Sequence, residues 1–333
     1  MSRQPRSTRR RALVAATALL PLALTATACS SDPSPDTKAA GAPAAGFPYT
    51  VDNCGVKTTY DAPPKRAVTM NQHVTEIMLE LGLEKSLVGT AYLDDQVLPE
   101  YREAYESVPV VAKTYPSKEK LLSVNPDFVY GGYGSAFDAK DGRTREDLKK
   151  AGIETRLNLE YCTKQRTTMD DVYREVDEVA RTFGVGERAQ KWMAEARATV
   201  AKTEAERART KAAPVPVFVY DSGDKTAFTV GGKGIGNELI SRAGGHNVFS
   251  DIDKSFGDAS WEQVVARKPE VIVIYDYGAT TLEQKKQRLL KDPALKDVPA
   301  VKNKRFAVLP LSDAVVGVRA PDAIAKLAPQ LAR

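Results

Sequence analysis

The chain has 333 residues, of which 42% are hydrophobic and 27% charged, so it is long enough for two domains that each bury a core. The formal net charge of +5 depends on five arginines within the first 28 residues, a segment that contains no acidic residue. Without that segment 43 basic residues balance 43 acidic ones. This balance excludes the strongly basic surface on which non-specific nucleic-acid binding depends.

Residues 1–28 have the pattern of a secretory signal peptide. The arginines precede an apolar, alanine-rich run that is too short for a convincing membrane-spanning helix. The run ends in Thr25-Ala26-Thr27-Ala28-Cys29, which resembles the lipobox of bacterial lipoproteins and predicts a lipid on Cys29. A plain cleaved signal peptide is the alternative, because position 26 carries alanine where leucine is usual. The export route, Sec or twin-arginine, stays open.

Residues 29–46 are rich in Pro, Ala, Gly and Ser and show no apolar periodicity. Such a segment cannot bury enough surface to offset its chain entropy, so we expect a flexible tether. A lipid at one end of this tether would hold the folded part at the outer face of the cytoplasmic membrane, outside the cell's interior.

The three cysteines agree with an oxidising compartment. If Cys29 carries lipid, Cys54 and Cys162 remain as a pair that can form a disulfide. That bond would close a loop of about 108 residues and stabilise the fold by roughly 4–5 kcal/mol in the chain-entropy model. Two buried free thiols are the alternative. Neither cysteine lies in a CxxC motif or a Cys/His cluster, which disfavours redox catalysis and structural zinc.

Short apolar segments alternate with segments of helical periodicity, which favours parallel α/β layers. Strands are expected at residues 66–70, 86–91, 127–132, 216–221, 271–276 and 305–310. After the first of these, Val74, Ile77, Met78 and Leu81 lie at helical spacing and predict one apolar helix face.

Residues 186–211 contain no Gly or Pro after the first position and are dominated by Ala, Glu, Arg and Lys. They predict one helix of about 25 residues, roughly 35–40 Å long. A second α/β unit begins with PVPVFVYD at Pro214. The expected organisation is an N-terminal α/β lobe over 47–185, a connecting helix over 186–212, and a C-terminal α/β lobe over 213–333.

Two stretches share one plan: SKEKLLSVNPDFVYGG from Ser117 and SWEQVVARKPEVIVIYDYG from Ser260. Each has a Ser, a Glu two residues later, two aliphatic residues, and Pro-Asp or Pro-Glu before an apolar strand. On one interpretation Ser117 and Ser260 cap two helices whose dipoles Glu119 and Glu262 complement. On the other, the two glutamates mark matched surfaces that dock on a symmetric partner.

Five sequence blocks together resemble a known family. They are APPKRAVTMNQHVTEIMLELGLEKSLVGTAYLDD, LLSVNPDFVYGG, NELISRAGGHNVFSD, SWEQVVARKPEVIVIY and DPALKDVPAVKNKRFAVLP. In this order, over roughly residues 47–330, they resemble the class III periplasmic substrate-binding proteins of ABC importers for iron siderophores, haem and cobalamin. The resemblance implies two Rossmann-like lobes joined by a single long helix, a ligand cleft between the lobes, and little hinge closure. It also implies that Glu119 and Glu262 each meet arginines on one subunit of a permease dimer, which works with a cytoplasmic ATPase.

Ligands of open α/β units bind beyond the carboxyl ends of the strands. The candidate ligand-binding residues there are Asn71, Gln72, His73, Tyr92, Asp94, Tyr133, Phe137, Tyr220, Asp221, Lys233, Tyr275, Tyr277 and Arg319, with Ser135, Ser222 and Ser312 nearby. Tyrosine rings with one or two fixed cations would suit a bulky, often anionic ferric chelate. Alternatively, Tyr92 and Tyr275 belong to the core and Arg319 pairs with Asp322.

The chain has only two histidines, His73 and His246, one in each expected lobe, which disfavours a bare zinc or manganese site. Haem stays an alternative ligand, because His73 and a tyrosine could supply axial ligands. Cobalamin or another bulky cofactor would also suit such a cleft.

Enzyme motifs are missing from the sequence. GGKGIG at 231–236 is neither a dinucleotide fingerprint nor a phosphate-binding P-loop, and no GxSxG motif occurs. The expected function is therefore that of a monomeric lipoprotein which captures a ferric siderophore and delivers it to an ABC permease, with no cofactor apart from the N-terminal lipid. A tethered surface protein that docks a partner without transport is the remaining alternative.

Overall fold

The computed structural model describes residues 44–162 and 164–332. The expected signal peptide, Cys29 and most of the tether lie outside these ranges. No helix within them is long and apolar enough to cross a membrane.

The first lobe is built on a parallel sheet with the strand order β5-β4-β3-β6-β7. Its strands are β3 (Ala67–Met70), β4 (Leu87–Ala91), β5 (Val110–Ala112), β6 (Phe128–Gly131) and β7 (Glu154–Leu157). β3 and β6 are buried along their whole length, as strands covered on both faces must be. The three strands predicted in this lobe are confirmed, whereas β5 and β7 were not predicted.

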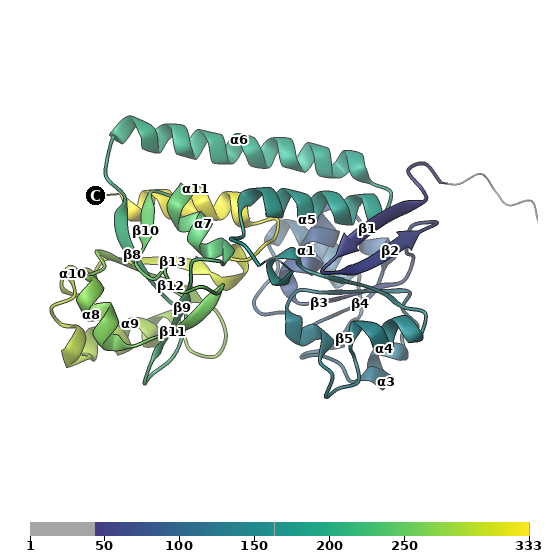
Figure 1. Cartoon of the computed structure of the whole chain (residues 1–333), viewed down its shortest axis with the longest axis horizontal. Helices are drawn as coiled ribbons and strands as arrows, with labels where there is room; N and C mark the ends of the chain where they lie inside the picture. The colour runs from purple at the N-terminus through teal and green to yellow at the C-terminus, as the bar shows by residue number, and fades with distance from the viewer. Residues whose placement is uncertain (1–43, 163, 333) are drawn as a thin grey trace, which may run out of the picture. The chain divides into compact units, whose positions relative to one another are not determined.

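Helices cover both faces of this sheet (Figure 1). They are α1 (Gln72–Glu80), α2 (Arg102–Glu106), α3 (Lys118–Leu122), α4 (Arg145–Lys150) and α5 (Met169–Thr182). The predicted apolar face of α1 is confirmed, because Val74, Ile77, Met78 and Leu81 are fully buried. This face holds the start of α1, and with it the polar residues that follow β3, against the core.

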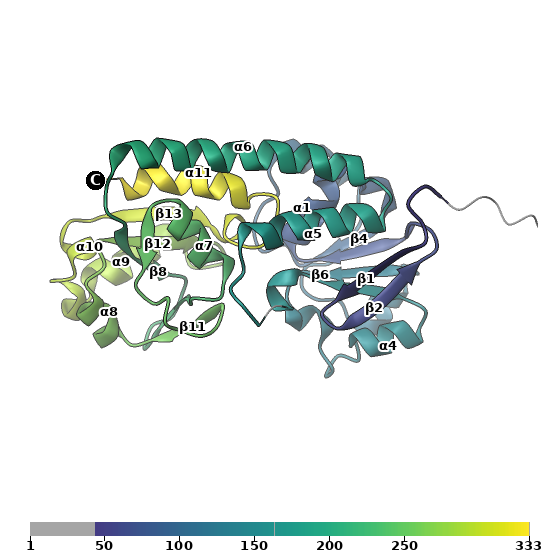
Figure 2. The same ribbon diagram turned by 45° about the horizontal axis from the view of Figure 1, so that its top comes forward.

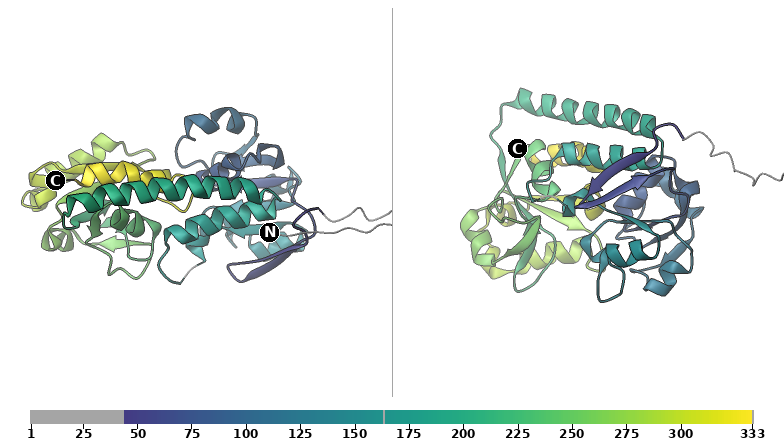
Figure 3. Two further views of the ribbon diagram at one scale, coloured as in Figure 1. Left: turned by 90° about the horizontal axis from the view of Figure 1, so that it is seen from above. Right: turned by 45° about the vertical axis from the view of Figure 1, so that its right-hand side comes forward.

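The predicted long helix is confirmed as α6 (Gly186–Thr210), which ends where Lys211 adopts a left-handed conformation with φ 52°. Its buried residues Ala189, Trp192, Ala196, Val200 and Thr203 recur at helical spacing. α6 contacts α5 of the first lobe and the C-terminal helix α11 (Ala320–Leu331), as Figures 1 and 3 show. One stripe of small and apolar side chains on α6 therefore packs against helices of both halves of the chain.

The second lobe has its own parallel sheet, with the strand order β10-β8-β12-β13. Its strands are β8 (Val215–Tyr220), β10 (Gly245–Asn247), β12 (Val271–Asp276) and β13 (Phe306–Pro310). An antiparallel pair, β9 (Ala227–Val230) and β11 (Phe256–Ala259), lies beside it. Further helices are α7 (Ile235–Arg242), α8 (Trp261–Arg267), α9 (Leu282–Lys291) and α10 (Pro299–Lys302).

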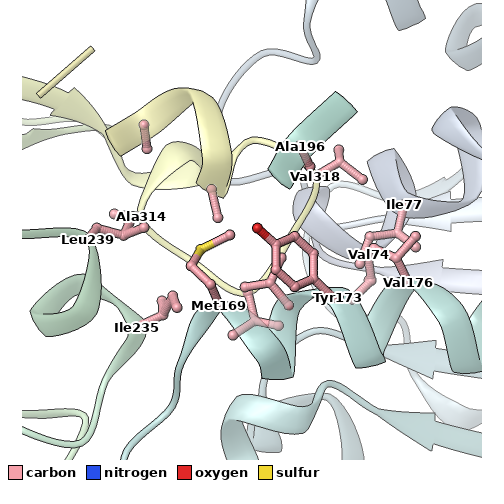
Figure 4. Close-up of a cluster of buried hydrophobic side chains, with 14 of the residues drawn as sticks. Val74, Ile77, Met169, Tyr173, Val176, Ala196, Ile235, Leu239, Ala314 and Val318 are labelled. Carbon is pink, nitrogen blue, oxygen red and sulfur yellow. The ribbon is translucent and has the colours of Figure 1, made fainter. Parts of the chain in front are cut away.

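The two lobes share one hydrophobic core in addition to a smaller core within each lobe. One continuous cluster joins Val74 and Ile77 of α1 to Leu239 of α7, with Met169 and Tyr173 of α5 between them (Figure 4). Sliding one lobe against the other would expose this apolar surface to water. The shared core thus favours the small hinge closure that the family resemblance implies.

An N-terminal hairpin of β1 (Tyr49–Asn53) and β2 (Val56–Tyr60) precedes the first sheet (Figure 2). At its turn, Cys54 forms a disulfide with Cys162, with 4.6 Å between the two Cα atoms. Asn53 strengthens this junction, because its side chain donates to Leu157 O at 2.9 Å and accepts from Leu157 N at 2.8 Å. The predicted pairing of the two cysteines is confirmed.

Candidate ligand-binding site

The carboxyl ends of β3 and β4 carry two residues in conformations that L-amino acids seldom adopt. Asn71 has φ 93° and Tyr92 has φ 52°. The chain holds Asn71 there through a hydrogen bond from its backbone N–H to Ala91 O at 2.9 Å, and its Oδ1 accepts from the Tyr115 hydroxyl at 2.9 Å. Strained backbone of this kind concentrates at functional sites.

Aromatic side chains of the first lobe gather at the same edge of the sheet. The rings of Tyr92 and Tyr115 meet edge to face with centroids 4.6 Å apart. Tyr133 lies 5.0 Å from the His73 ring and 5.6 Å from the ring of Tyr161, which is 40% exposed. Tyr115 and Tyr161 were missed in the sequence. They follow β5 and β7, so recognising these two short strands would have identified them.

The second lobe presents a carboxylate and a tyrosine at its own strand ends. Asp221 follows β8, and the hydroxyl of Tyr277, just after β12, donates to Asp221 Oδ1 at 2.5 Å. The buried ammonium of Lys285 lies 4.4 Å from the centroid of the Tyr277 ring and donates to Tyr275 O at 2.5 Å. The positive charge of Lys285 also acts on Asp221 and opposes the rise that burial causes in the pKa of that carboxyl.

Hydrogen bonds show that the strand ends of the two lobes meet, since the loop after β7 bonds to Ile235 and Val316 of the second lobe. Electrostatic interactions cross the same junction. Burial raises the pKa of the Tyr277 hydroxyl, the neighbouring Asp221 raises it further, and Asp94 of the first lobe adds to this effect. Glu160 of the first lobe likewise contributes to the raised pKa of buried Tyr275 in the second.

Carboxyl groups dominate the charge at this junction. Burial raises the pKa of Asp94 to about 6 and that of Glu160 to about 7, and it also raises the pKa of Asp221. Glu160 links the lobes, because its Oε1 accepts from the backbone N–H of Ile235 at the start of α7. The side chain of Asn158 adds a second link by donating to Val316 O at 2.8 Å.

Both cations predicted to hold an anionic ligand are already paired. Arg319 is 5% exposed and donates through Nε to Glu76 Oε2 at 2.6 Å. It also pairs with Asp313 at 3.3 Å, and not with Asp322 as the alternative had it. The ammonium of Lys233 lies 2.8 Å from Asp253. Arg319 is therefore not free to meet an anionic chelate, whereas the pair of Lys233 is with a carboxylate that is 85% exposed and is weak.

Four other candidates are engaged in the packing of the lobes. The side chain of Gln72 donates to Gln96 O at 2.6 Å and accepts from Asp95 N, which shapes the loop after β4. Tyr220 and Tyr275 belong to the hydrophobic core, as expected for Tyr275 in the alternative interpretation. Phe137 packs on the core beneath the guanidinium of Arg145. Of the predicted set, Asn71, Tyr92, Asp94, Tyr133, Asp221 and Tyr277 converge where the lobes meet.

His73 lies beneath this group and is almost fully buried. Its Nε2 contacts Gly132 O at 3.3 Å, and Gly132 leaves no room for a side chain, since a Cβ there would lie 2.5 Å from the imidazole Cε1. Ligation of haem iron by His73 would require this contact to break. Among the described residues, no group of three or more His, Cys, Asp or Glu side chains is placed to hold a metal ion.

Acid should destabilise the protein through His73, because burial lowers the pKa of its imidazole to about 4. The unfolded chain takes up a proton on His73 below pH 6.5 that the folded protein does not, so the stability due to this residue is complete above pH 6.5 and is lost as the pH falls toward 4. Between pH 7.5 and 4.5 this amounts to about 2–3 kcal/mol. Urea unfolding of wild type and His73→Gln at both pH values measures it.

The quantity to compare is the change in unfolding free energy between the two pH values, in wild type and in His73→Gln. The comparison is needed because Asp94 and Glu160 change the stability with pH in the opposite direction. Because the pKa values of these two carboxyl groups are raised in the folded protein, their contribution to stability is largest in acid. It is lost as the pH rises through 6 for Asp94 and through 7 for Glu160. His246→Gln is the control, since His246 is exposed. Equal pH dependence of wild type and His73→Gln would contradict the prediction.

The duplicated corner has the predicted capping geometry. Ser117 Oγ accepts from Lys120 N at the start of α3, and Ser260 Oγ accepts from Gln263 N at the start of α8. Glu119 and Glu262 are exposed in the first turns, where hydrogen bonds from the backbone and the capping serines lower their pKa values. The capping interpretation is confirmed, and it leaves both carboxylates free to meet a partner.

A separate hollow of about 460 Å³ lies between α6 and α11. It is lined mainly by alanines and by the aliphatic stems of α6 side chains, and by none of the strand-end residues described above. We take the junction of the strand ends as the candidate site, because ligands of open α/β units bind beyond the carboxyl ends of the strands.

Comparison with known proteins identifies the class of protein that this fold and site define. Residues 68–312 match the periplasmic binding protein family, and the chain belongs to that family. Proteins of this family are the substrate-binding components of transport systems and not enzymes.

The names of individual relatives give different ligands. The chain is 25% identical over 215 residues to the vitamin B12-binding protein of Vibrio parahaemolyticus, which covers 65% of this chain and 72% of the relative. A periplasmic binding protein from Veillonella parvula has 29% identity and a TM-score of 0.78, covering 85% and 97% of the two chains. A Fe3+-hydroxamate transport protein from Saccharomonospora viridis has the same fold, with 24% identity, a TM-score of 0.74, and coverage of 86% and 100%.

Proposed function

We propose that this periplasmic binding protein captures a ferric siderophore outside the cytoplasmic membrane and delivers it to an ABC permease dimer and its ATPase. The observation that carries the proposal is the group of tyrosines at the carboxyl ends of two facing parallel sheets, Tyr92, Tyr115, Tyr133 and Tyr161 from one lobe and Tyr277 from the other. Tyrosines offer flat apolar faces and hydroxyl groups, which suit a bulky chelate with a polar periphery.

Cobalamin is the second candidate, because the relative from Vibrio parahaemolyticus is a vitamin B12-binding protein. It is also bulky, with an apolar macrocycle and amide side groups. Haem has less support from the site, since His73 is buried against Gly132.

A ligand panel tests the proposed function. Residues 43–333 form one compact unit and provide the protein for isothermal titration calorimetry. The panel contains ferric trihydroxamates, a ferric tricatecholate, ferric citrate, haem and cyanocobalamin. Saturable binding of a ferric chelate at sub-micromolar concentration is expected, whereas binding of cyanocobalamin or haem alone would overturn the choice of ligand.

We also propose that Cys29 carries a lipid, that residues 29–46 form the tether, and that a monomer with lobes over 47–185 and 213–333, joined by 186–212, docks on the permease. In this arrangement Glu119 and Glu262 contact one permease subunit each. The support is their equivalent position in the first turn of α3 and α8, exposed and held by a capping serine.

Reversing both charges, with Glu119→Arg and Glu262→Arg, should abolish uptake of the ligand and leave its binding affinity unchanged. Charged pairs at an interface govern association, and two repulsive contacts against permease arginines would prevent docking. Uptake of the ⁵⁵Fe-labelled chelate by cells and calorimetry on the purified variant give the two measurements.

The chain supplies a matched control pair. Glu146 in α4 and Glu283 in α9 occupy the same first-turn position after a capping threonine, and both are exposed. Glu146→Arg with Glu283→Arg should leave uptake intact. Equal loss of uptake in the two double variants would show that helix capping, and not docking, explains the effect.

A further inference from the structure

We propose that Asp94, with Asn71 beside it, selects the ligand by charge: the site accepts neutral or cationic chelates that present an N–H donor and rejects anionic ones. This inference rests on the proposed function and narrows its ligand class. It reverses the expectation, drawn from the sequence, of an anionic chelate held by fixed cations.

One carboxylate oxygen of Asp94 has no hydrogen-bond partner. It lies in the loop after β4, half-buried, and its Oδ2 is buried without a hydrogen-bond partner among the described residues. The groups that act on it most strongly are backbone N–H groups, the Asn71 side chain and the carboxylate of Asp95, and none of these is a cation. A buried oxygen of this kind has the capacity to accept one more strong hydrogen bond.

Asn71 lies beside Asp94. It is fully buried, its Oδ1 accepts from the Tyr115 hydroxyl, and its side chain also acts on Asp94 through a hydrogen bond. The position left unused is therefore Asp94 Oδ2. An N–H or ammonium group of the ligand would satisfy it.

Nearby cations have other partners. Lys233 pairs with Asp253 and Arg319 with Glu76 and Asp313. Lys285, which is buried and bonded to Tyr275 O, lies on the side of Asp221.

The remaining guanidinium, that of Arg143, is fully buried under the Tyr115 ring at 5.4 Å. It is bonded to Ala136 O and pairs with Asp141, so its charge is balanced there, while its Nε has no hydrogen-bond partner among the described residues. Asp94 therefore lacks a counterion among the described residues, as does Glu160, whose partners are backbone N–H groups. An anionic chelate would meet unbalanced negative charge, while a cationic one would supply the missing partner.

The test uses three ferric trihydroxamates with the same metal centre and different net charge: a linear chelate with a free ammonium, a neutral cyclic peptide chelate, and the linear chelate with its amine succinylated. Calorimetry at pH 7.5 and low salt is expected to rank them cationic, neutral, anionic, with at least about tenfold between the first and last. In Asp94→Asn the cationic chelate should lose about tenfold in affinity and the ranking should collapse. Asp170→Asn, an exposed carboxylate on α5, should keep the wild-type ranking.

The wild-type ranking keeps the inference testable even if Asp94→Asn folds poorly. Equal or tighter binding of the succinylated chelate by wild type would overturn it, and so would a full charge ranking in folded Asp94→Asn. These results would leave the siderophore function standing, because a ferric chelate would still bind. If no ferric chelate of any charge binds, the proposed function is overturned and this inference with it.

Discussion

Replacing Arg319 by methionine should lower the free energy of unfolding by about 3–5 kcal/mol, because it leaves the buried carboxylate of Glu76 without its cation, whereas Asp313 keeps its pair with Lys326. Arg319 precedes α11, and its guanidinium pairs with Glu76 of α1 and with Asp313, all three side chains being at most 5% exposed. It also donates to Gln96 O at 2.8 Å. The ion pair joins segments 243 residues apart in sequence and connects the two lobes.

Urea unfolding of residues 43–333 measures the effect. Arg305→Met is the control, since Arg305 is only partly buried and donates to the terminal carbonyls of α11 without an ion pair among the described residues. Arg305→Met should lower the free energy of unfolding by no more than about 1 kcal/mol. Adding Glu76→Gln to Arg319→Met should restore part of the stability, because the uncompensated charge is then removed. A loss below about 1 kcal/mol for Arg319→Met would show that the buried pair contributes little to the fold.

Removing the disulfide with Cys54→Ser and Cys162→Ser should cost about 4–5 kcal/mol as an upper estimate, since the bond closes a loop of 108 residues in the unfolded chain. The bond also holds the β1–β2 hairpin against the loop after β7, next to the paired hydrogen bonds of Asn53. Urea unfolding under non-reducing conditions gives the comparison.

Wild type treated with a thiol reductant should unfold at the same urea concentration as the double variant. This control separates the covalent bond from any packing effect of the two serines. An unchanged midpoint in both cases would mean that the hydrogen bonds of the hairpin suffice to hold it.

The elements predicted correctly are those whose signals are local. β3, β4, β6, β8, β12 and β13 are short apolar runs that a buried parallel strand requires. α6 follows from 25 residues of high helix propensity, and the serine caps follow from side chains that reach backbone N–H groups three residues on.

β5 escaped prediction because it has only three residues, and β7 because it includes the charged Glu154 and Arg156. The charge on β7 is compensated in three dimensions: Arg156 is buried against Glu175 at 2.7 Å and Glu178 at 2.9 Å, both on α5. Missing these strands also meant missing Tyr115 and Tyr161 at their ends. A polar strand is recognisable only when its partners are known.

By itself, the sequence determined the α/β class, the long helix, the cysteine pair and the edge of each sheet at which polar residues gather, because strand alternation, propensity and cysteine count do not depend on distant contacts. Only the tertiary structure decided which of those polar residues remain free. Arg319 and Lys233 are occupied by Glu76 and Asp253, while Asp94 is left without a cation among the described residues. The charge of a site is a sum over neighbours from distant segments, and no local pattern in the chain encodes that sum.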